Sequence, residues 1–226
     1  MPGTEKRFQE AGREQESFFA PIEKRLLLRM ARATPPWINS DHLTLLGFVA
    51  MFGAGVCYWL ARSNRFMLLG VILCLAANWW GDSLDGTLAR VRNRQRPRYG
   101  FYVDHITDAF GTLFLVGGMG LSGYMSPMVA AALLIVYFML SIQAYLAAYA
   151  LGTFQLSYWK FSPTELRVLL VLGNLALFRW PAGTLFGYRF PLFDAGGIAG
   201  IAGMSLMLIV SSIRHTAELY RAERLP

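Results

Sequence analysis

The sequence predicts an all-α membrane protein, with six transmembrane helices preceded by an amphipathic helix in the membrane interface. Only 15% of the 226 residues are charged, well below the roughly 25% typical of soluble domains. Residues 129–151 and 196–213 contain no charged side chain, and apolar runs of about 18 residues or more can span a bilayer. Runs of this length disfavour a soluble protein with buried helices.

The first predicted element is a helix from Glu16 to Ala33. Basic side chains take several of its faces, and four apolar side chains recur at spacings of three and four: Phe19, Ile22, Leu26 and Met30. A basic amphipathic helix of this kind is typical of the cytosolic membrane interface, although a soluble docking helix shows a similar pattern. The prolines that follow end the helix, so residues 1–34 are predicted to form a cytosolic N-terminal part.

Six apolar segments follow in residues 35–226, which we treat as one transmembrane domain. They are Leu43–Ala61, Phe66–Leu88, Gly100–Ser122, Met128–Leu151, Thr164–Phe178 with neighbouring residues, and Leu192–Ile213. Ser40 and Asp41 precede the first segment and are plausible N-caps for it. Cys57 and Cys74 lie within apolar segments, where we expect them to pack as small hydrophobic side chains without a disulfide or a metal.

The distribution of basic residues predicts the orientation in the membrane. If the N-terminus is cytosolic, 17 of the 21 Lys and Arg residues fall on the cytosolic side. The opposite side then holds only Arg62, Arg65, Arg179 and Arg189. This bias agrees with the positive-inside rule. We therefore expect an integral membrane protein, in the inner membrane if the source is bacterial, with its N-terminus in the cytosol.

The stretch from Gly81 to Gly111 concentrates the acidic residues of the membrane segments. Its four aspartates are Asp82, Asp85, Asp104 and Asp108. The first two are three residues apart and the last two are four apart, so each pair lies on one face of a helix. Small residues lie on the same faces: Gly86, Ala89, Gly100 and Gly111. Two such faces opposite each other would form a pocket in which like charges repel. Divalent cations with oxygen ligands would relieve this repulsion and would bind a diphosphate.

Arginine follows the first acidic pair. Arg90 lies eight residues after Asp82, near the same helix face, where its guanidinium could neutralise a phosphate through a forked contact. Arginine then recurs at every second position as far as Arg98. For Arg92 to Arg98 we expect contact with anionic lipid at the cytosolic surface.

The pattern Asp82-x2-Asp85-Gly86-x2-Ala89-Arg90-x9-Gly100-x3-Asp104-x3-Asp108 resembles the signature of CDP-alcohol phosphotransferases at all eight positions. The resemblance extends to the six-span organisation of the whole chain. It implies that Asp82, Asp85 and Asp104 hold two divalent cations, Mg²⁺ or Mn²⁺, with Asp108 beside the second cation. It also implies that Gly86 and Ala89 let the cytidine of the donor approach, together with Asp82, and that Arg90 contacts the diphosphate.

The reaction implied by the resemblance is the attack of an alcohol on the β-phosphorus of a CDP-linked alcohol, with release of CMP, in phospholipid biosynthesis. Two cations can clamp the attacking and leaving oxygens of such a transfer, and a nearby carboxylate can accept the proton of the alcohol. The expected partners are the CDP-alcohol donor, an alcohol or lipid acceptor and membrane lipids, with no nucleic acid. Members of this family are usually homodimers, so we expect a homodimer with residues 35–226 as its catalytic domain.

The sequence departs from the family pattern before the first span. Many members have Pro-Asn-x-x-Thr there, whereas this chain has Ser40-Asp41-His42-Leu43-Thr44. Asp41 therefore stands where an asparagine contact to the nucleotide is expected, and a simple helix cap is the alternative.

Two further positions resemble the choline and ethanolamine phosphotransferases. They are His105, directly after Asp104, and the pair Thr164-Glu165 at the start of the fifth span. Either Asp108 or His105 could be the general base, since an unperturbed histidine titrates close to neutral pH, whereas His105 could also be a packing residue. Glu165 is a candidate for the acceptor site. Arg167 could hold an anionic acceptor there or extend to the membrane surface.

The sequence leaves the substrates open. The donor is either CDP-diacylglycerol with a polar acceptor, or a CDP-choline-like or CDP-ethanolamine-like molecule with a diacylglycerol-like acceptor; His105 and Glu165 slightly favour the second. Outside the family, an intramembrane prenyltransferase would use aspartate pairs to bind Mg²⁺-diphosphate, and Asn78-x3-Asp82 echoes that pattern, but six spans are too few. A non-catalytic cation transporter or scaffold is the third possibility, although the internal repeats common in transporters are not visible.

Overall fold

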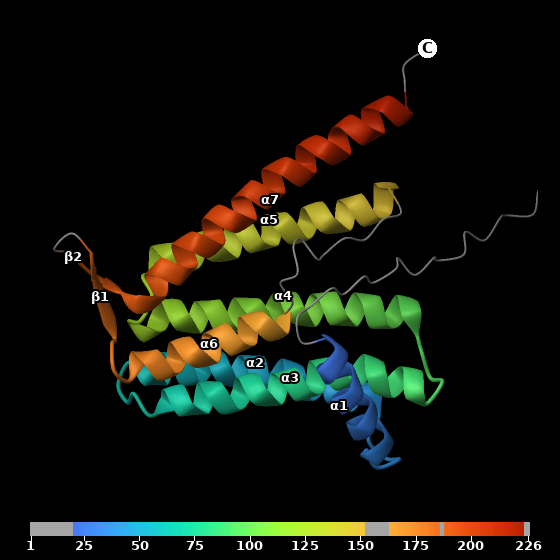
Figure 1. Ribbon diagram of the computed structural model, residues 1–226, viewed down its shortest axis with the longest axis horizontal. Helices are drawn as coiled ribbons and strands as arrows, with labels where there is room; N and C mark the ends of the chain where they lie inside the picture. The colour runs from blue at the N-terminus through green and yellow to red at the C-terminus, as the bar shows by residue number, and fades with distance from the viewer. Residues whose placement is uncertain (1–19, 152–162, 186–187, 224–226) are drawn as a thin grey trace, which may run out of the picture.

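The computed structural model describes residues 20–151, 163–185 and 188–223, which form seven helices and one hairpin (Figure 1). The helices are α1 (Ala20–Ala33), α2 (Ser40–Ala61), α3 (Met67–Val91), α4 (Pro97–Ser122), α5 (Pro127–Leu151), α6 (Pro163–Leu177) and α7 (Leu192–Ala222). The hairpin pairs β1 (Ala182–Leu185) with β2 (Tyr188–Pro191) in antiparallel register. The all-α class is confirmed apart from this hairpin, which the sequence analysis did not predict. Glu16 to Phe19 of the predicted first helix lie outside the described residues.

Four helices of the described part are long and apolar enough to cross a bilayer, namely α2, α3, α5 and α7. Helix α4 has 26 residues but carries charged side chains in its first half. Helix α6 has 15 residues, about 22 Å at 1.5 Å per residue, which is short of the roughly 30 Å of a bilayer core. The protein is therefore a membrane protein by its apolar helices, and six spans stay a prediction.

Helix α2 packs against both α3 and α4, and these three helices form the central unit of the bundle. Helix α5 packs on α4 and α7 packs on α5, so that these two form an outer layer, while α6 lies along α3 (Figure 1). We call the end of the bundle that contains α1 the α1 end, and the opposite end the hairpin end. Helices α2, α4 and α6 begin at the α1 end, and α3 ends there.

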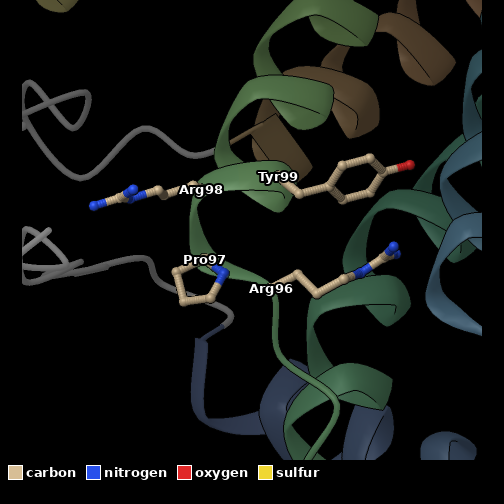
Figure 2. Close-up of a pocket in the computed structure, with 4 residues that line it drawn as sticks. All are labelled: Arg96, Pro97, Arg98 and Tyr99. Carbon is tan, nitrogen blue, oxygen red and sulfur yellow. The ribbon is translucent and has the colours of Figure 1, made fainter.

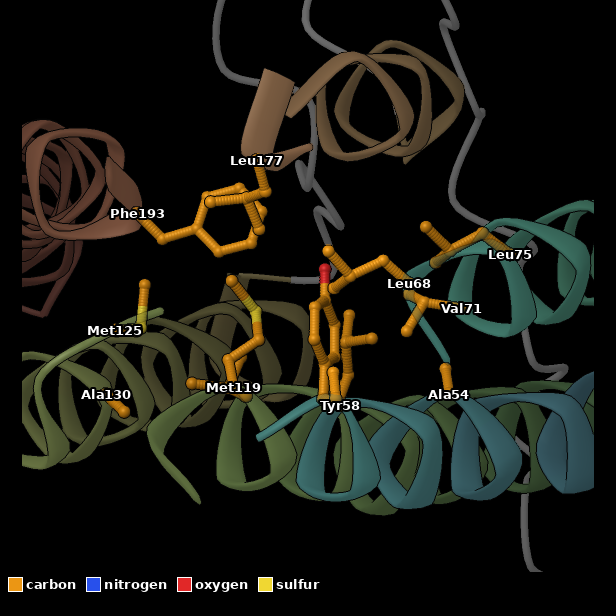
Figure 3. Close-up of a cluster of buried hydrophobic side chains, with 13 residues drawn as sticks. Ala54, Tyr58, Leu68, Val71, Leu75, Met119, Met125, Ala130, Leu177 and Phe193 are labelled. Carbon is orange, nitrogen blue, oxygen red and sulfur yellow. The ribbon is translucent and has the colours of Figure 1, made fainter. Parts of the chain in front are cut away.

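The main hydrophobic core lies towards the hairpin end. Its side chains come from helices α2 to α7 and from the turn before α5, and Figure 3 shows them around the buried ring of Tyr58. The hydroxyl of Tyr58 accepts a hydrogen bond of 2.7 Å from the amide of Asn174, which links α2 to α6. Asp194, at the start of α7, accepts hydrogen bonds from the backbone and the hydroxyl of Ser126, directly before α5. These contacts fix the far ends of the helices that carry the site.

A smaller core at the α1 end attaches α1 to the bundle. Leu27 and Ala31 are buried against α2 and α3, in a cluster with Leu43, Leu84 and Leu88. The predicted apolar stripe of α1 is divided, because Met30 packs against this cluster whereas Leu26 is 45% exposed. Helix α1 has two apolar faces, one against the protein and one exposed, because Leu26 and Leu27 are adjacent and point about 100° apart.

The start of α2 differs from the prediction. Asn39, not Ser40 or Asp41, is the N-cap. Its side-chain oxygen accepts from the backbone N–H of His42 at 3.1 Å, and its own N–H donates to Nδ1 of His42 at 3.3 Å. This reciprocal pair satisfies two of the backbone donors at the helix start, and the predicted N-caps fall inside the first turn.

Close helix contacts bring the acidic stretch against α2. A Cβ on Gly81 would lie 2.5 Å from the carbonyl oxygen of Leu43, so only glycine permits this approach of α3 to α2. Gly111 of α4 faces the side chain of Met51 on α2, which a Cβ would meet at 3.2 Å. Cys57 and Cys74 are free thiols that contact each other between α2 and α3.

Candidate active site

Three of the four aspartates form one carboxylate cluster. Oxygen atoms of Asp82 on α3 and of Asp104 and Asp108 on α4 all lie within 4.8 Å of one another. Asp82 and Asp104 are half-buried, whereas Asp108 is exposed. A donor set of carboxylate oxygens at this separation fits a hard divalent cation, which would relieve the mutual repulsion of the three charges.

Asp85 lies outside this carboxylate cluster and is bound to the start of α2. Its Oδ2 accepts a hydrogen bond of 2.6 Å from Thr44 Oγ1, and its Oδ1 accepts one of 2.5 Å from the backbone N–H of Gly86. Ser40 Oγ donates to the carbonyl oxygen of Asp85 at 3.0 Å. The role of Asp85 as a metal ligand stays a prediction. In that role, its carboxylate would be oriented by the hydrogen bond from Thr44.

Arg167 brings a positive charge to the carboxylate cluster from α6. One guanidinium nitrogen lies 2.5 Å from Asp82 Oδ2, and Nε donates to Asn78 Oδ1 at 2.8 Å. Asn78 is buried and donates in turn to the carbonyl oxygen of Gly47 on α2. Arg167 therefore points into the bundle at the carboxylate cluster and does not extend to the membrane surface. Glu165, two residues earlier, is half-buried in the first turn of α6.

His105 faces α5. Its Nδ1 lies 2.6 Å from the carbonyl oxygen of Phe101, and Nδ1 donates in this contact because a carbonyl oxygen can only accept. The ring packs between Phe101, with centroids 4.2 Å apart, and Tyr145, with centroids 5.3 Å apart and planes at 78°. Nδ1 is 3.9 Å from a carboxylate oxygen of Asp104. His105 thus lies beside the carboxylate cluster, on the side of α4 that α5 covers.

Arg90 and its neighbours lie at the end of α3. The exposed guanidinium donates to Thr87 Oγ1 at 3.1 Å and lies over Gly86, where a Cβ would be 3.5 Å from it. Ala89 is half-buried. The predicted donor-binding residues therefore occupy adjacent positions at the α1 end, one to two turns of helix beyond Asp82.

The arginine loop makes contacts within the protein that the sequence analysis did not predict. Arg92 donates to three carbonyl oxygens of the α1–α2 connection: Thr34 at 2.8 Å, Pro35 at 2.9 Å, and Ile38. Arg96 forms an ion pair with Asp41. Arg92 and Arg96 therefore bind to the segment around the start of α2, and contact of this loop with anionic lipid stays a prediction.

Arg96 and Tyr99 lie together at the start of α4. The guanidinium of Arg96 lies 4.1 Å from the ring centroid of Tyr99, and Figure 2 shows both on one side of the start of α4, with Arg98 on the other. The hydrogen bond to Asp41 raises the pKa of Arg96 above its usual value, so it stays cationic. A cavity of about 190 Å³ adjoins this pair and is lined by Asp41, Thr44, Leu45, Phe48, Tyr99, Val103 and Thr107.

Several site residues were not identified from the sequence. Thr44 had a signal, because it occupies the threonine position of the pattern before the first span, yet no role was assigned to it. Tyr137 and Tyr145 of α5 come from a charge-free span without a motif, so no local signal existed. Tyr145 contacts the ring of His105 beside the carboxylate cluster, and Tyr137 lies eight residues before it on the same helix.

Comparison with known families accounts for most of the chain. The family description of CDP-alcohol phosphatidyltransferases matches residues 37–210, which include the carboxylate cluster, Arg90, His105 and Arg167. A search of curated proteins found no match. The matched region covers both acidic helices and the six segments predicted to span the membrane, apart from the last three residues of the sixth. With this match and the carboxylate cluster between α3 and α4, the chain belongs to the CDP-alcohol phosphatidyltransferase family.

Proposed function

We propose that this protein transfers a substituted phosphate group from a CDP-linked alcohol to a hydroxyl acceptor and releases CMP. The observation that carries the proposal is the carboxylate cluster of Asp82, Asp104 and Asp108 within a membrane bundle that matches the family. In the reaction, the acceptor oxygen forms a bond to the β-phosphorus. The bond from this phosphorus to the bridging oxygen breaks, and CMP leaves with that oxygen.

The carboxylate cluster and Asp85 would hold two divalent cations, Mg²⁺ or Mn²⁺. When bound, the cations supply positive charge to the diphosphate and to the leaving oxygen. Thr44 would orient the carboxylate of Asp85 through its hydrogen bond of 2.6 Å, in the way that outer residues fix metal ligands in other proteins. Arg167 neutralises part of the charge of Asp82.

The donor would lie at the α1 end of the site. Arg90 is exposed there and would contact the diphosphate, while Gly86 and Ala89 leave room for the cytidine. The cavity beside Asp41 and Thr44 offers polar groups next to the aromatic rings of Phe48 and Tyr99, a combination that suits a nucleoside. A nucleoside in this cavity would contact Asp41, which would then bind substrate in addition to forming part of the first turn of α2.

Asp108 is the better-supported general base. It combines membership of the carboxylate cluster with an exposed side chain, so an acceptor hydroxyl can reach it. His105 is enclosed by Phe101 and Tyr145, which supports a role in orienting the acceptor. If this is right, Asp108→Asn should abolish most turnover, and His105→Ala should cost less than the roughly 10²-fold minimum usual for a lost base.

Glu165 and Arg167 would form part of the acceptor site at the start of α6. The resemblance of His105 and Glu165 to the choline and ethanolamine branch favours a diacylglycerol-like acceptor. A base function of Asp108 alone would instead favour a CDP-diacylglycerol donor with a polar acceptor. Both reactions share the same displacement at phosphorus and differ in which substrate carries the lipid.

The protein would span the membrane six times, with α4 and α6 as the two further spans. The positive-inside distribution of Lys and Arg supports a cytosolic α1 end, and the exposed Leu26 supports contact of α1 with the membrane interface. Lys160, counted on the cytosolic side, lies outside the described residues. A homodimer in a bacterial inner membrane is the expected assembly.

The test is a panel of donors and acceptors with purified protein in lipid nanodiscs. CDP-diacylglycerol, CDP-choline and CDP-ethanolamine are each paired with polar alcohols and with diacylglycerol, and CMP and lipid products are measured by mass. Activity should require Mg²⁺ or Mn²⁺, stop with EDTA and be absent from Asp82→Asn. Full turnover in EDTA, or CMP release by Asp82→Asn at the wild-type rate, would contradict the proposal.

A further inference from the structure

One carboxylate oxygen connects three helices next to the site. Glu23 lies in the first turn of α1, and its Oε1 accepts a hydrogen bond of 2.9 Å from Trp79 Nε1 on α3. The same atom accepts a hydrogen bond of 3.0 Å from Thr164 Oγ1 at the start of α6. Neither the signature motif nor the chemistry proposed above uses Glu23.

The partners of Glu23 lead directly to the carboxylate cluster. On α3, Trp79 is three residues before Asp82. On α6, Thr164 is three residues before Arg167, whose guanidinium lies 2.5 Å from Asp82. Residues three apart lie on the same side of a helix, so Glu23 and Arg167 form two successive cross-links between α3 and α6. The cross-link through Glu23 is the one nearer the start of α6.

Glu23 is itself held in place. Leu27, four residues later on the same side of α1, is buried in the smaller core with Ala31. The carboxylate also lies at the N-terminus of α6, where the helix dipole favours a negative charge. At its far end α6 is fixed by the hydrogen bond of Asn174 to Tyr58 and by the buried Leu177. Glu23 and Arg167 provide two contacts that hold its near end.

We propose that Glu23 is a positioning residue, which holds the start of α6 so that the guanidinium of Arg167 stays at the carboxylate cluster. The contacts are independent of the reaction, whereas the effect on turnover rests on the function proposed above. Through Glu23, helix α1 helps to position the active site.

Three variants on the full chain test this link. Glu23→Ala removes both hydrogen bonds, whereas Glu23→Gln keeps an acceptor oxygen at the same place. Arg25→Ala is the matched control, because Arg25 is exposed on the same helix. CMP release should give a kcat/KM about tenfold or more lower for Glu23→Ala, since small displacements of positioned groups are costly. Glu23→Gln should stay within about threefold of wild type by the same reasoning, and Arg25→Ala close to wild type.

A double-variant comparison shows whether Glu23 acts through Arg167. If it does, Glu23→Ala in an Arg167→Ala background should lower kcat/KM by less than about twofold further, because residues acting as one unit are not additive. A full tenfold loss in that background would overturn the inference.

Amide hydrogen exchange provides a readout without substrate. In nanodiscs, exchange in residues 163–172 should be faster in Glu23→Ala and in Thr164→Val than in wild type and Glu23→Gln, because local opening requires less free energy. Exchange in residues 173–177 should not change. Unchanged exchange in both altered variants would refute the positioning role. Faster exchange in a protein that releases no CMP from any donor would uphold the positioning role of Glu23 and refute the proposed function. If Glu23→Ala does not fold, Thr164→Val still tests the contact between α1 and α6.

Discussion

Replacing Asp108 with Asn should have opposite effects on thermal stability with and without divalent cations. In a chelator the variant should be more stable than wild type, because it removes one of three carboxylate charges that lie within 4.8 Å of one another. With Mg²⁺ or Mn²⁺ the wild type should be the more stable protein, because the variant lacks one of the ligands.

The magnitude follows from the geometry. Two unit charges 4.8 Å apart repel by about 0.9 kcal/mol in water and by about 3.5 kcal/mol at an effective dielectric constant of about 20. Asp108 is exposed, so the lower value applies. It takes part in two such pairs, and Arg167 already compensates part of the charge of Asp82. The expected gain in the chelator is therefore about 1–2 kcal/mol, or about 2–8 °C in Tm for a chain of this size.

Thermal unfolding of the purified protein in EDTA and in saturating Mg²⁺ measures both effects. A cation at about 100 times its Kd should stabilise the wild type by about 2.7 kcal/mol and the variant by less. Asp41→Asn is the control, because Asp41 is paired with Arg96 outside the carboxylate cluster. The reasoning is refuted if Asp108→Asn melts below wild type in EDTA, or if Mg²⁺ raises the Tm of both proteins equally.

Three further predictions concern neighbouring contacts. Thr44→Val removes the hydrogen bond to Asp85 and should lower CMP release about 10- to 100-fold, the usual cost of losing a residue that orients a metal ligand. Near-normal turnover would show that this hydrogen bond is dispensable. Arg92→Ala should destabilise the protein by about 1.5–3 kcal/mol or more in chemical unfolding, because Arg92 binds backbone carbonyls before α2. Arg94 is exposed, so Arg94→Ala should leave the stability unchanged. Equal effects of the two substitutions would contradict this reasoning. Asp194→Ala should lower the unfolding free energy by about 2–4 kcal/mol, because a buried acceptor of two hydrogen bonds from Ser126 is lost. A loss below about 0.5 kcal/mol would contradict this.

The sequence by itself determined the class and the family. Long charge-free runs can only be buried or placed in lipid, so they predicted the apolar helices that the structure contains, such as α5 and α7. The spacing of Asp104 and Asp108 fixed both carboxylates on one face of α4, because helix geometry is local. The signature read along α3 and α4 indicated the family that the comparison confirms.

Local patterns were less informative about caps and loops. Asn39, rather than Ser40 or Asp41, caps α2, since all three side chains can cap a helix and packing decides where the helix begins. The basic loop looked like a lipid-binding segment because its charges have no partner in the adjacent sequence. Arg92 and Arg96 find their partners more than fifty residues earlier, and local sequence contains no information about such contacts.

Only the tertiary structure decided how the acidic faces are arranged. The rotation of α3 against α2 and α4 places Asp82 in the carboxylate cluster and gives Asp85 to Thr44, although both aspartates share one helix face. Gly81 permits that approach. The contacts of Arg167 with Asp82 and of Glu23 with Thr164 join segments 85 and 141 residues apart. Helix packing sets such distances through side-chain contacts between elements, whereas sequence spacing fixes only the face of each single helix.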